Sequence, residues 1–464
     1  MSAYVRLPAS LLTNPTTGEQ MPAAATQSPT EVEALLGAAQ EAARDWGMRP
    51  LQFRASVLKV AAGLLRQERD LLARTISLEM GKPLAEGLAE IEKSAWNCEY
   101  VAEQSARWLA DEIVPTYASL SYVAYRPLGV VLAILPWNFP VWQVFRCAVS
   151  ALMAGNAVML KHAPNVPQSA AAVTDLLRRA GVPPGVFQNL VIPVERIAEV
   201  IKDTRISAVT FTGSPASGAA VAMAAGAACK KSILELGGSD AFIVLEDADL
   251  DAAVAAAVRA RFSNCGQVCL ASKRFIVTDR CWSEFSARFV QAVSALRVGD
   301  PLDVRTQIGP LARQDLRDAL DEQVQRSVAG GARLLVGGHK LAGRGYFYAP
   351  TVLTDVEPDS PAAIEETFGP IAPLLRARSA QHAIELANES RYGLGAVVWT
   401  RDVERARAMA SQLQAGSVAI NAVTASDPRL PVGGVKLSGY GRELGAAGMR
   451  ELVNVQSVVI GPLV

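Results

Sequence analysis

Two cysteines in the run FSNCGQVC, residues 262–269, are the side chains best suited to nucleophilic chemistry. The run follows an alanine-rich helical segment and consists mainly of small and polar residues. Cysteine reacts as the thiolate, and with a reference pKa of about 8.5 only a few per cent of a free thiol is ionised at neutral pH. We take Cys269 as the nucleophile and expect its surroundings to activate it.

Histidine, the usual activator of a thiol, is scarce in this chain. The three histidines, His162, His339 and His382, are all distant from Cys269 in sequence. Glu235 in ELGG is the candidate general base instead, since it ends the apolar strand pattern SIL and two glycines after it allow a ligand to approach closely.

A carboxamide follows another predicted strand. The apolar run VVLAIL, residues 130–135, ends in PWNFP, which contains Asn138. An amide NH2 directed at a developing oxyanion stabilises a transition state. A rigid turn closed by an Asx hydrogen bond explains the same residues, so the motif alone leaves both interpretations open.

Two more strand ends carry groups suited to a ribose or a phosphate. Lys161 follows the strand pattern AVML, and GSPASG, residues 213–218, precedes a helix whose N-terminus favours an anion. The glycine turn is neither a P-loop nor GxGxxG. A surface lysine and a plain turn explain these residues equally well. The later run EETFGP, residues 365–370, by itself indicates a solvated acidic turn.

Composition excludes several classes of protein. The 464 residues carry 45 basic and 45 acidic side chains, so no net field attracts nucleic acid or an anionic membrane. We expect a cytoplasmic protein, because neither a signal-like N-terminus nor a long apolar run is present. Six cysteines are too few for a disulfide scaffold, and no cluster has metal-ligand spacing.

The elements that position these residues follow from periodicity. The first hundred residues are mostly helical, starting with a capping box at SPTE, and their charges are expected to mark solvated faces. A hairpin is predicted near residues 114–129. Strand and helix patterns then alternate through AFIVL, residues 241–245, and again from Asp247, which predicts doubly wound parallel sheets that bind ligands at the carboxyl ends of their strands.

Six motifs in this order resemble the aldehyde dehydrogenase superfamily, over almost the whole chain: PWNFP, GSPASG, ELGG, FSNCGQVC, EETFGP and PVGGVKLSGYGRE. The resemblance implies an α/β fold with a Rossmann-type cofactor domain, an α/β catalytic domain and a small β oligomerisation element. The implied boundaries are 1–108 and 128–237 for the cofactor domain, 238–445 for the catalytic domain, and 109–127 with 446–464 for the oligomerisation element.

The resemblance also implies catalytic roles. Cys269 matches the nucleophile, Glu235 the base that activates water, and Asn138 the oxyanion donor beside the Cys269 backbone N–H. The implied reaction oxidises an aldehyde to an acid through a thiohemiacetal and a thioester. A helix end and the cofactor are expected to favour the thiolate.

The cofactor implied is NAD or NADP. The matching positions are Ile134, Pro136, Trp137, Lys161, Pro164, Gly213, Ser214, Gly218, Leu236, Gly237, Glu366 and Phe368. NAD-preferring relatives carry a glutamate where this chain has Pro164, so the sequence leaves both cofactors open. His162 beside it is expected to be packed, with contact to a phosphate as the alternative.

Within the family, KHAPNVPQS, ELGGSDAFIVLEDADL and GRELG are most similar to bacterial succinate-semialdehyde dehydrogenases of the Sad type. Such enzymes bind the distal carboxylate through arginine, which implies a role for Arg146. Ser263 replaces a second arginine, and Arg429 is the residue expected to compensate. Trp142 completes the predicted substrate site.

Other functions stay open at this stage: oxidation of another aliphatic or aromatic aldehyde, a cofactor-independent Cys/Glu amidase or acyltransferase, and a non-catalytic binding protein. GSPASG and EETFGP disfavour the amidase, which has no use for a cofactor site. The expected partners are an aldehyde and further copies of the chain, in a homodimer or homotetramer, because exposed strand edges are a liability in a monomer.

Overall fold

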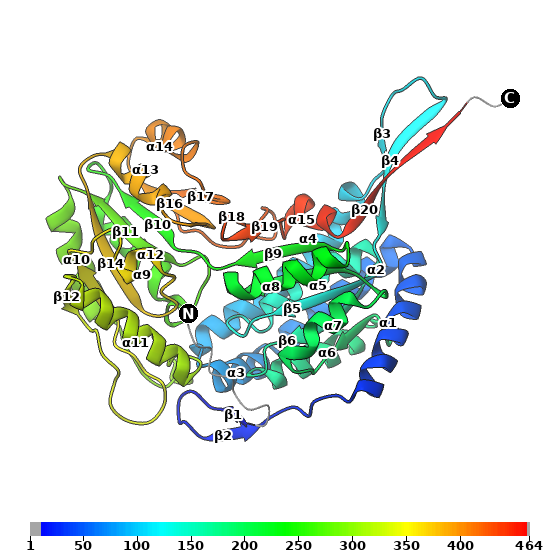
Figure 1. Ribbon diagram of the computed structural model, residues 1–464, viewed down its shortest axis with the longest axis horizontal. Coiled ribbons are helices and arrows are strands. Elements are labelled where there is room, and N and C mark those ends of the chain that lie inside the picture. Colours follow the sequence, from blue (N-terminus) through cyan, green and yellow to red (C-terminus); the bar gives the residue numbers. More distant parts are fainter. Residues whose placement is uncertain (1–10, 462–464) are drawn as a thin grey trace.

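Two β-sheets, each covered by helices, organise the chain into two lobes (Figure 1). The computed structural model describes residues 11–461. The long N-terminal helices belong to the first lobe: α1 (Pro29–Met48), α2 (Leu51–Gln67), α3 (Arg69–Met80) and α4 (Leu84–Trp108). The predicted capping box is present, since the Ser28 side chain accepts from Glu31 N and the Glu31 side chain accepts from Ser28 N.

The first sheet has six strands in the order β19-β9-β8-β5-β6-β7. Their bounds are β5 (Val130–Leu135), β6 (Ala157–His162), β7 (Phe187–Asn189), β8 (Ile206–Gly213), β9 (Lys231–Leu236) and β19 (Gly439–Tyr440). The strands β5 to β9 are all parallel. The chain adds β6 and β7 on one side of β5 and then β8 and β9 on the other side, so the strand order reverses between β5 and β8. That switch point is where doubly wound sheets open a ligand crevice at their carboxyl edge.

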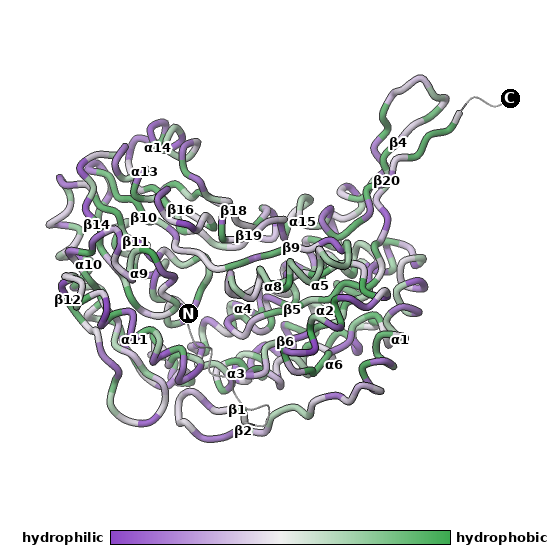
Figure 2. Tube along the Cα trace, in the orientation of Figure 1, coloured by the Kyte–Doolittle hydropathy of each residue, from purple (hydrophilic) through white to green (hydrophobic). Residues whose placement is uncertain are grey.

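Helices connect the strands of this first sheet and cover its faces. They are α5 (Trp142–Ala154), α6 (Pro167–Arg179), the 3-10 turn η1 (Val194–Arg196), α7 (Ile197–Lys202) and α8 (Pro215–Ala227). The strands VVLAIL and AVMLKH are buried along their whole length, as parallel strands covered on both faces must be. Figure 2 shows the same apolar strands running between helices with polar outer faces.

The second sheet has seven strands in the order β12-β13-β14-β11-β10-β16-β17. Their bounds are β10 (Asp240–Val244), β11 (Ser272–Thr278), β12 (Arg333–Val336), β13 (Thr351–Thr354), β14 (Ile371–Ala377), β16 (Gly395–Trp399) and β17 (Ser417–Ile420). Only β12 runs antiparallel to its neighbour. The surrounding helices are α9 (Leu250–Phe262), α10 (Trp282–Ser294), α11 (Gln314–Ala329), α12 (Pro361–Ile364), α13 (Ala380–Asn388) and α14 (Val403–Ala410).

Sequence patterns misplaced part of this second sheet. The alternation grouped AFIVL with the first sheet, but this strand is β10 and lies between β11 and β16. Two adjacent glycines, Gly237 and Gly238, carry the chain from one sheet to the other, and no helix or long linker marks the change. Strands β14 and β16 were not predicted, and β14 contains Pro373, which weakens a strand pattern.

A third, three-stranded antiparallel sheet projects from the first lobe (Figure 1). It contains β3 (Glu112–Ile113), β4 (Leu120–Pro127) and β20 (Val453–Ile460), with β20 paired along all of β4. The preceding helix α15 (Gly445–Glu451) belongs instead with the first lobe, because Met449 and Leu452 pack into its core. The projecting part therefore begins at Val453 and not at residue 446.

Four short strands complete the fold: β1 (Leu11–Thr13) with β2 (Gln20–Pro22), and β15 (Tyr392–Gly393) with β18 (Val435–Lys436). The β1–β2 hairpin reaches the second lobe, where Tyr346 N donates to Pro15 O at 2.9 Å. Among residues 11–461, no helix is long and apolar enough to cross a membrane.

Candidate active site

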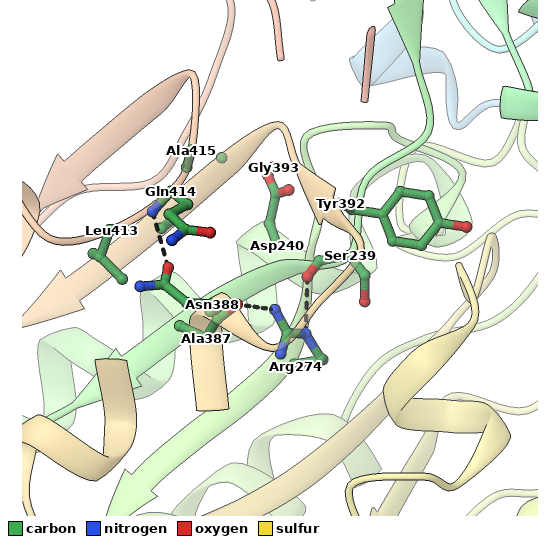
Figure 3. A pocket seen from close by; sticks show the side chains of 13 residues that line it. Ser239, Asp240, Arg274, Ala387, Asn388, Tyr392, Gly393, Leu413, Gln414 and Ala415 are labelled. Atoms are coloured by element: carbon green, nitrogen blue, oxygen red, sulfur yellow. Dashed lines mark hydrogen bonds between the residues drawn. The ribbon is translucent and has the colours of Figure 1, made fainter. Parts of the chain in front are cut away.

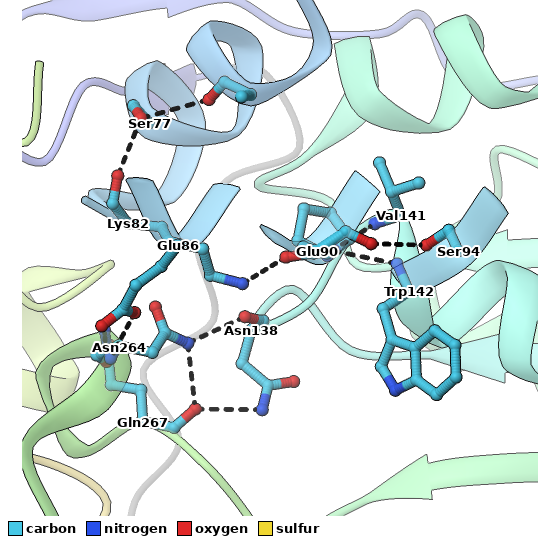
Figure 4. Close-up of polar contacts among 12 residues, drawn as sticks. Ser77, Lys82, Glu86, Glu90, Ser94, Asn138, Val141, Trp142, Asn264 and Gln267 are labelled. Carbon is cyan, nitrogen blue, oxygen red and sulfur yellow. Dashed lines mark hydrogen bonds and ion pairs between the residues drawn. The ribbon is translucent and has the colours of Figure 1, made fainter. Parts of the chain in front are cut away.

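The two lobes meet through the two motifs PWNFP and FSNCGQVC. PWNFP follows β5 at the switch point, and FSNCGQVC connects α9 to β11. Asn138 Nδ2 donates to Gln267 O at 3.0 Å, and Asn264 Nδ2 donates back to Asn138 O at 2.9 Å (Figure 4). The predicted oxyanion donor and the predicted nucleophile thus belong to loops in direct contact.

The nucleophile loop has an unusual backbone. Asn264, Cys265 and Gly266 all have positive φ angles, of 52°, 56° and 71°. Such angles are costly for residues with a Cβ, so surrounding contacts must hold them. A Cβ on Gly266 would clash with Gly369 O of the EETFGP turn, and the buried Arg261 guanidinium donates to that carbonyl as well.

Cys269 is half-buried and is fixed through its backbone. Lys273 Nζ donates to Cys269 O at 2.7 Å and pairs with Glu366 at 3.0 Å. Within the described residues the Cys269 N–H donates to no protein acceptor, which leaves it available to an oxyanion.

The surroundings of Cys269 disfavour the thiolate. Burial raises the pKa of the Cys269 thiol to about 12, and the Glu235 carboxylate adds to the rise, whereas Arg146 and Lys273 oppose it. Helix α9 gives no help, because it ends at Phe262 and so turns the negative end of its dipole toward the loop.

Cys265 differs from Cys269 in its position. Its side chain is fully buried in the core of the second lobe, where desolvation raises the pKa of the thiol far above its ordinary value. Cys265 is also closed to solvent whereas Cys269 is partly exposed, which favours Cys269 as the nucleophile.

Glu235 lies at the end of β9 in a buried charge cluster. Arg146 is only 2% exposed, and its Nη1 lies 3.1 Å from Glu235 Oε2. Its Nε pairs with Glu443, and its Nη2 donates to Thr212 Oγ1 at 3.1 Å. Burial raises the pKa of Glu235, and Arg146 partly offsets that effect. A base with a raised pKa suits proton abstraction near neutral pH.

This cluster gives Arg146 partners that the sequence could not show. Its guanidinium faces two carboxylates of the protein, Glu235 and Glu443, which a substrate carboxylate would have to share or displace. The predicted contact of Arg146 with substrate stays a prediction.

Two other predicted substrate residues also have protein partners. Ser263 Oγ donates to Arg259 O at 2.8 Å in the last turn of α9. Arg429 is exposed and binds Asp427 with two hydrogen bonds of 2.8 and 2.7 Å. Trp142, by contrast, is buried in an apolar cluster, and Cys269 packs against that cluster.

The predicted phosphate and ribose groups follow β8 and β6, the two strands that flank β5. Ser214 is the N-cap of α8 and accepts from Ser217 N, and a Cβ on Gly218 would come within 2.5 Å of Leu236. Lys161 is buried at the end of β6, where its Nζ donates to His162 O. A lysine and a helix N-terminus at the same edge of the sheet fit an anionic dinucleotide.

The remaining predicted cofactor positions come from both lobes. Glu366 accepts from Gly238 N at 3.0 Å, and a Cβ on Gly237 would clash with its carboxylate. Phe368 packs edge to face against Trp137, with 5.9 Å between ring centroids. Ile134, Gly213 and Leu236 lie at or near the strand ends, Pro136 begins the PWNFP turn, and Pro164 is exposed beyond β6.

His162 is packed, as expected, and supports the PWNFP turn. Its Nε2 donates to Pro140 O at 2.8 Å, while its Nδ1 accepts from Ala163 N. Burial lowers the pKa of His162 to about 4, so the ring is neutral and does not attract a phosphate.

A buried charge network formed by Lys82, just before α4, and by two glutamates of α4 was missed from sequence. Lys82 and Glu90 form an ion pair with both side chains 0% exposed, and Glu90 also accepts from Val141 N and Trp142 N at 2.9 Å (Figure 4). One turn away, Glu86 accepts from Asn264 N at 2.6 Å. The charges of this segment were expected to be solvated. The four-residue spacing of Lys82, Glu86 and Glu90 could have indicated that they face the same way and interact.

A small polar cavity elsewhere in the second lobe is structural. It lies between β10 and β16 and includes Asp240, whose pKa is raised by burial to about 7 (Figure 3). Arg274 in its wall donates to the carbonyls of Ser239, Leu386 and Ala387. None of the predicted catalytic residues lines it.

The carboxyl edge of the first sheet, which is of the dinucleotide-binding type, faces a cysteine and a buried glutamate. This arrangement is typical of a cofactor-dependent enzyme that forms a covalent intermediate on cysteine. The sequence matches the aldehyde dehydrogenase family over residues 9–458. The chain belongs to the aldehyde dehydrogenase family.

Individual relatives are similar over nearly their whole length. The chain is 48% identical to the Escherichia coli succinate semialdehyde dehydrogenase [NAD(P)+] Sad, over 96% of each chain. It is 47% identical to a probable succinate-semialdehyde dehydrogenase [NADP(+)] of Synechocystis, over 96% of this chain and 98% of that one. The succinic semialdehyde dehydrogenase of Streptococcus pyogenes, solved with NADP+, is 34% identical with a TM-score of 0.95, covering 98% of this chain and all 100% of that one.

Proposed function

We propose that the protein oxidises succinate semialdehyde to succinate with NADP or NAD. The observation that carries the proposal is the meeting of three groups from two lobes: the thiol of Cys269, the carboxylate of Glu235 and the amide of Asn138. The names of the most similar relatives support the substrate.

Residues of the first lobe would hold the cofactor. The N-terminus of α8 with Ser214 suits the pyrophosphate, and Lys161 suits the adenosine ribose or a 2′-phosphate. Pro164 offers no carboxylate to repel that phosphate, so NADP is accepted. Glu366 and Phe368 of the second lobe would contact the nicotinamide end, which their contacts with Gly238 N and with Trp137 support.

Cys269 then performs the first covalent step. Its sulfur attacks the aldehyde carbon, and the oxyanion that forms is stabilised by the free Cys269 N–H and by the Asn138 amide, which has one N–H left after its bond to Gln267 O. When bound, NADP or NAD accepts the hydride from this carbon, which leaves a thioester on the sulfur.

Glu235 performs the second step. As the carboxylate it takes a proton from water, the resulting hydroxide attacks the thioester carbon, and the sulfur leaves as the acid is released. Arg146 holds the Glu235 carboxylate in place and limits how far its pKa rises.

We also propose a cytoplasmic homo-oligomer in which residues 1–108 and 128–237 bind the cofactor and residues 238–445 carry the nucleophile. Exposed apolar side chains on the projecting β3–β4–β20 sheet support the assembly: Ile113, Leu120, Val455, Val459 and Ile460. Such a surface is more stable when another copy covers it.

Steady-state kinetics on a panel of aldehydes tests the function. We expect kcat/KM to be highest for succinate semialdehyde compared with glutarate semialdehyde, butanal and benzaldehyde, and NADP to be used at least as well as NAD. Higher kcat/KM for butanal would overturn the substrate. Absence of cofactor reduction with every aldehyde would overturn the dehydrogenase assignment itself.

A further inference from the structure

Lys273 connects the nucleophile to the EETFGP turn of the second lobe. It is the second residue of β11, four residues after Cys269, and its side chain is fully buried. Its Nζ donates to Cys269 O at 2.7 Å and to Glu366 Oε1 at 3.0 Å. Because burying an ammonium is costly unless hydrogen bonds compensate for it, these two contacts hold the side chain in one position.

The Glu366 carboxylate is oriented by two donors on the same oxygen. Gly238 N donates to Oε1 at 3.0 Å, as Lys273 Nζ does. The other oxygen, Oε2, lies toward Gly237, where a Cβ would come within 2.1 Å of it. With both donors on Oε1, the Oε2 atom can accept from a ligand, and a carboxylate oxygen suits the hydroxyls of a ribose.

The aromatic residue of the same turn also lies near the ammonium. Lys273 Nζ is 5.8 Å from the centroid of the Phe368 ring, a distance that fits a cation–π contact. Phe368 in turn packs against Trp137 of PWNFP. Lys273 therefore contacts the backbone of the nucleophile and both predicted cofactor residues of the EETFGP turn.

The charges of Lys273 and Glu366 act on the Cys269 sulfur with opposite sign. Burial is the largest cause of the raised pKa of the Cys269 thiol. The Lys273 ammonium lowers this pKa, whereas the Glu366 carboxylate raises it. The sulfur also faces charged side chains of three other elements: Glu235 of β9, Arg146 of α5 and Lys93 of α4.

We propose that Lys273 is a positioning residue that couples the cofactor to the nucleophile. It presents Glu366 to the hydroxyls of the nicotinamide ribose and holds the Cys269 carbonyl against the same turn. The coupling rests on the proposed function, since it concerns a nicotinamide cofactor. When Glu366 accepts from the ribose, part of the negative charge that offsets Lys273 is engaged elsewhere, so the ammonium acts more strongly on the sulfur.

Alkylation of Cys269 in the full-length protein without cofactor tests the electrostatic part. Lys273→Met removes the positive charge and keeps Glu366, so we expect the iodoacetamide rate at Cys269 at about pH 8 to fall roughly 3- to 10-fold. Glu366→Gln removes the negative charge and keeps the ammonium, so the rate should rise by a similar factor. Both variants break the same ion pair, so a merely structural role would change the two rates in the same direction.

Binding of NADP+, followed by the quenching of tryptophan fluorescence, tests the positioning part. We expect Kd to rise roughly tenfold in both variants, the loss typical of a hydrogen bond to a charged group. Lys340→Met is the matched control, because it removes a lysine of the second lobe that pairs with Asp318 at 2.8 Å near the surface. Its alkylation rate and Kd should equal those of the wild type.

The outcomes separate this proposal from the proposed function. If the wild type binds neither NADP+ nor NAD+, the proposed function is wrong and the coupling is wrong with it. If the wild type binds NADP+ but Lys273→Met binds it equally well, or both alkylation rates change in the same direction, only the Lys273 assignment is wrong. If Lys273→Met does not fold, Glu366→Gln still decides, since an unchanged or lower alkylation rate in that variant overturns the assignment.

Discussion

The reactive groups of this site are both held away from their charged forms. Burial raises the pKa of Cys269 and of Glu235, and each negative charge disfavours the other. Arg146 and Lys273 reduce this effect without cancelling it. In the protein without its ligands, then, the thiolate is a minor species, and its fraction increases steadily with pH.

Alkylation of Cys269 checks this directly. Because the pKa is raised, we expect the rate of modification by iodoacetamide, without cofactor, to keep rising from about pH 7 to about pH 10 with no plateau. Peptide mass spectrometry measures the extent of modification at Cys269 separately from that at the exposed Cys229. A plateau near neutral pH would show that the chain alone stabilises the thiolate.

At the scale of elements, α4 joins the two loops of the site. Its Glu90, which pairs with Lys82 just before the helix, holds the start of α5, next to the PWNFP turn, and its Glu86 holds the strained backbone at Asn264. The Lys82 ammonium also lies 3.6 Å from the centroid of the Phe139 ring. One helix thus fixes the oxyanion donor and the nucleophile relative to each other, although none of its charges takes part in the chemistry.

Removal of one member of this pair should be costly. Lys82→Met leaves Glu90 buried without its partner, and we expect a loss of about 3–5 kcal/mol in the free energy of unfolding. Arg288→Met, which breaks the exposed pair with Asp251, should cost less than about 1 kcal/mol. Urea denaturation followed by tryptophan fluorescence measures both, and equal losses would contradict the role given to burial.

At the scale of the molecule, the β3–β4–β20 sheet leaves apolar surface and strand edges open. Val455 and Val459 are 59% and 60% exposed, and they alternate along β20 on one face. Charged side chains on that face would oppose its burial against a second copy.

The double variant Val455→Asp/Val459→Asp should therefore shift the protein toward monomers. Size-exclusion chromatography with light scattering gives the mass of the wild type and the variant. We expect a dimer or tetramer for the wild type, and a smaller mass for the variant with its circular dichroism unchanged. A wild-type monomer would overturn the proposed assembly.

Local sequence was sufficient for much of the fold and for the identity of the reacting groups. Continuous apolar runs predicted the strands of the first sheet and period-3.6 patterns predicted its helices, because parallel strands are buried on both faces and amphipathic helices on one. Asn138 was predicted from its position after β5 and Glu235 from its position at the end of β9, since parallel strands bring their carboxyl ends to one edge of the sheet. Cys269 was distinguished from Cys265 by its motif, and the burial of Cys265 supports that choice.

Only tertiary structure decided which charges are free. The sequence gives the same charge to Arg146, Arg429 and Lys93. In the structure Arg146 pairs with Glu235, which is distant in sequence, and Arg429 pairs with nearby Asp427. Lys93 donates instead to Ser426. The same holds for Lys82, just before α4, whose partner Glu90 lies on the face of the helix that the fold buries. The spacing of residues along the sequence shows which of them share a helix or strand. Whether a charged side chain is free to bind a ligand depends instead on the side chains that the fold packs against it.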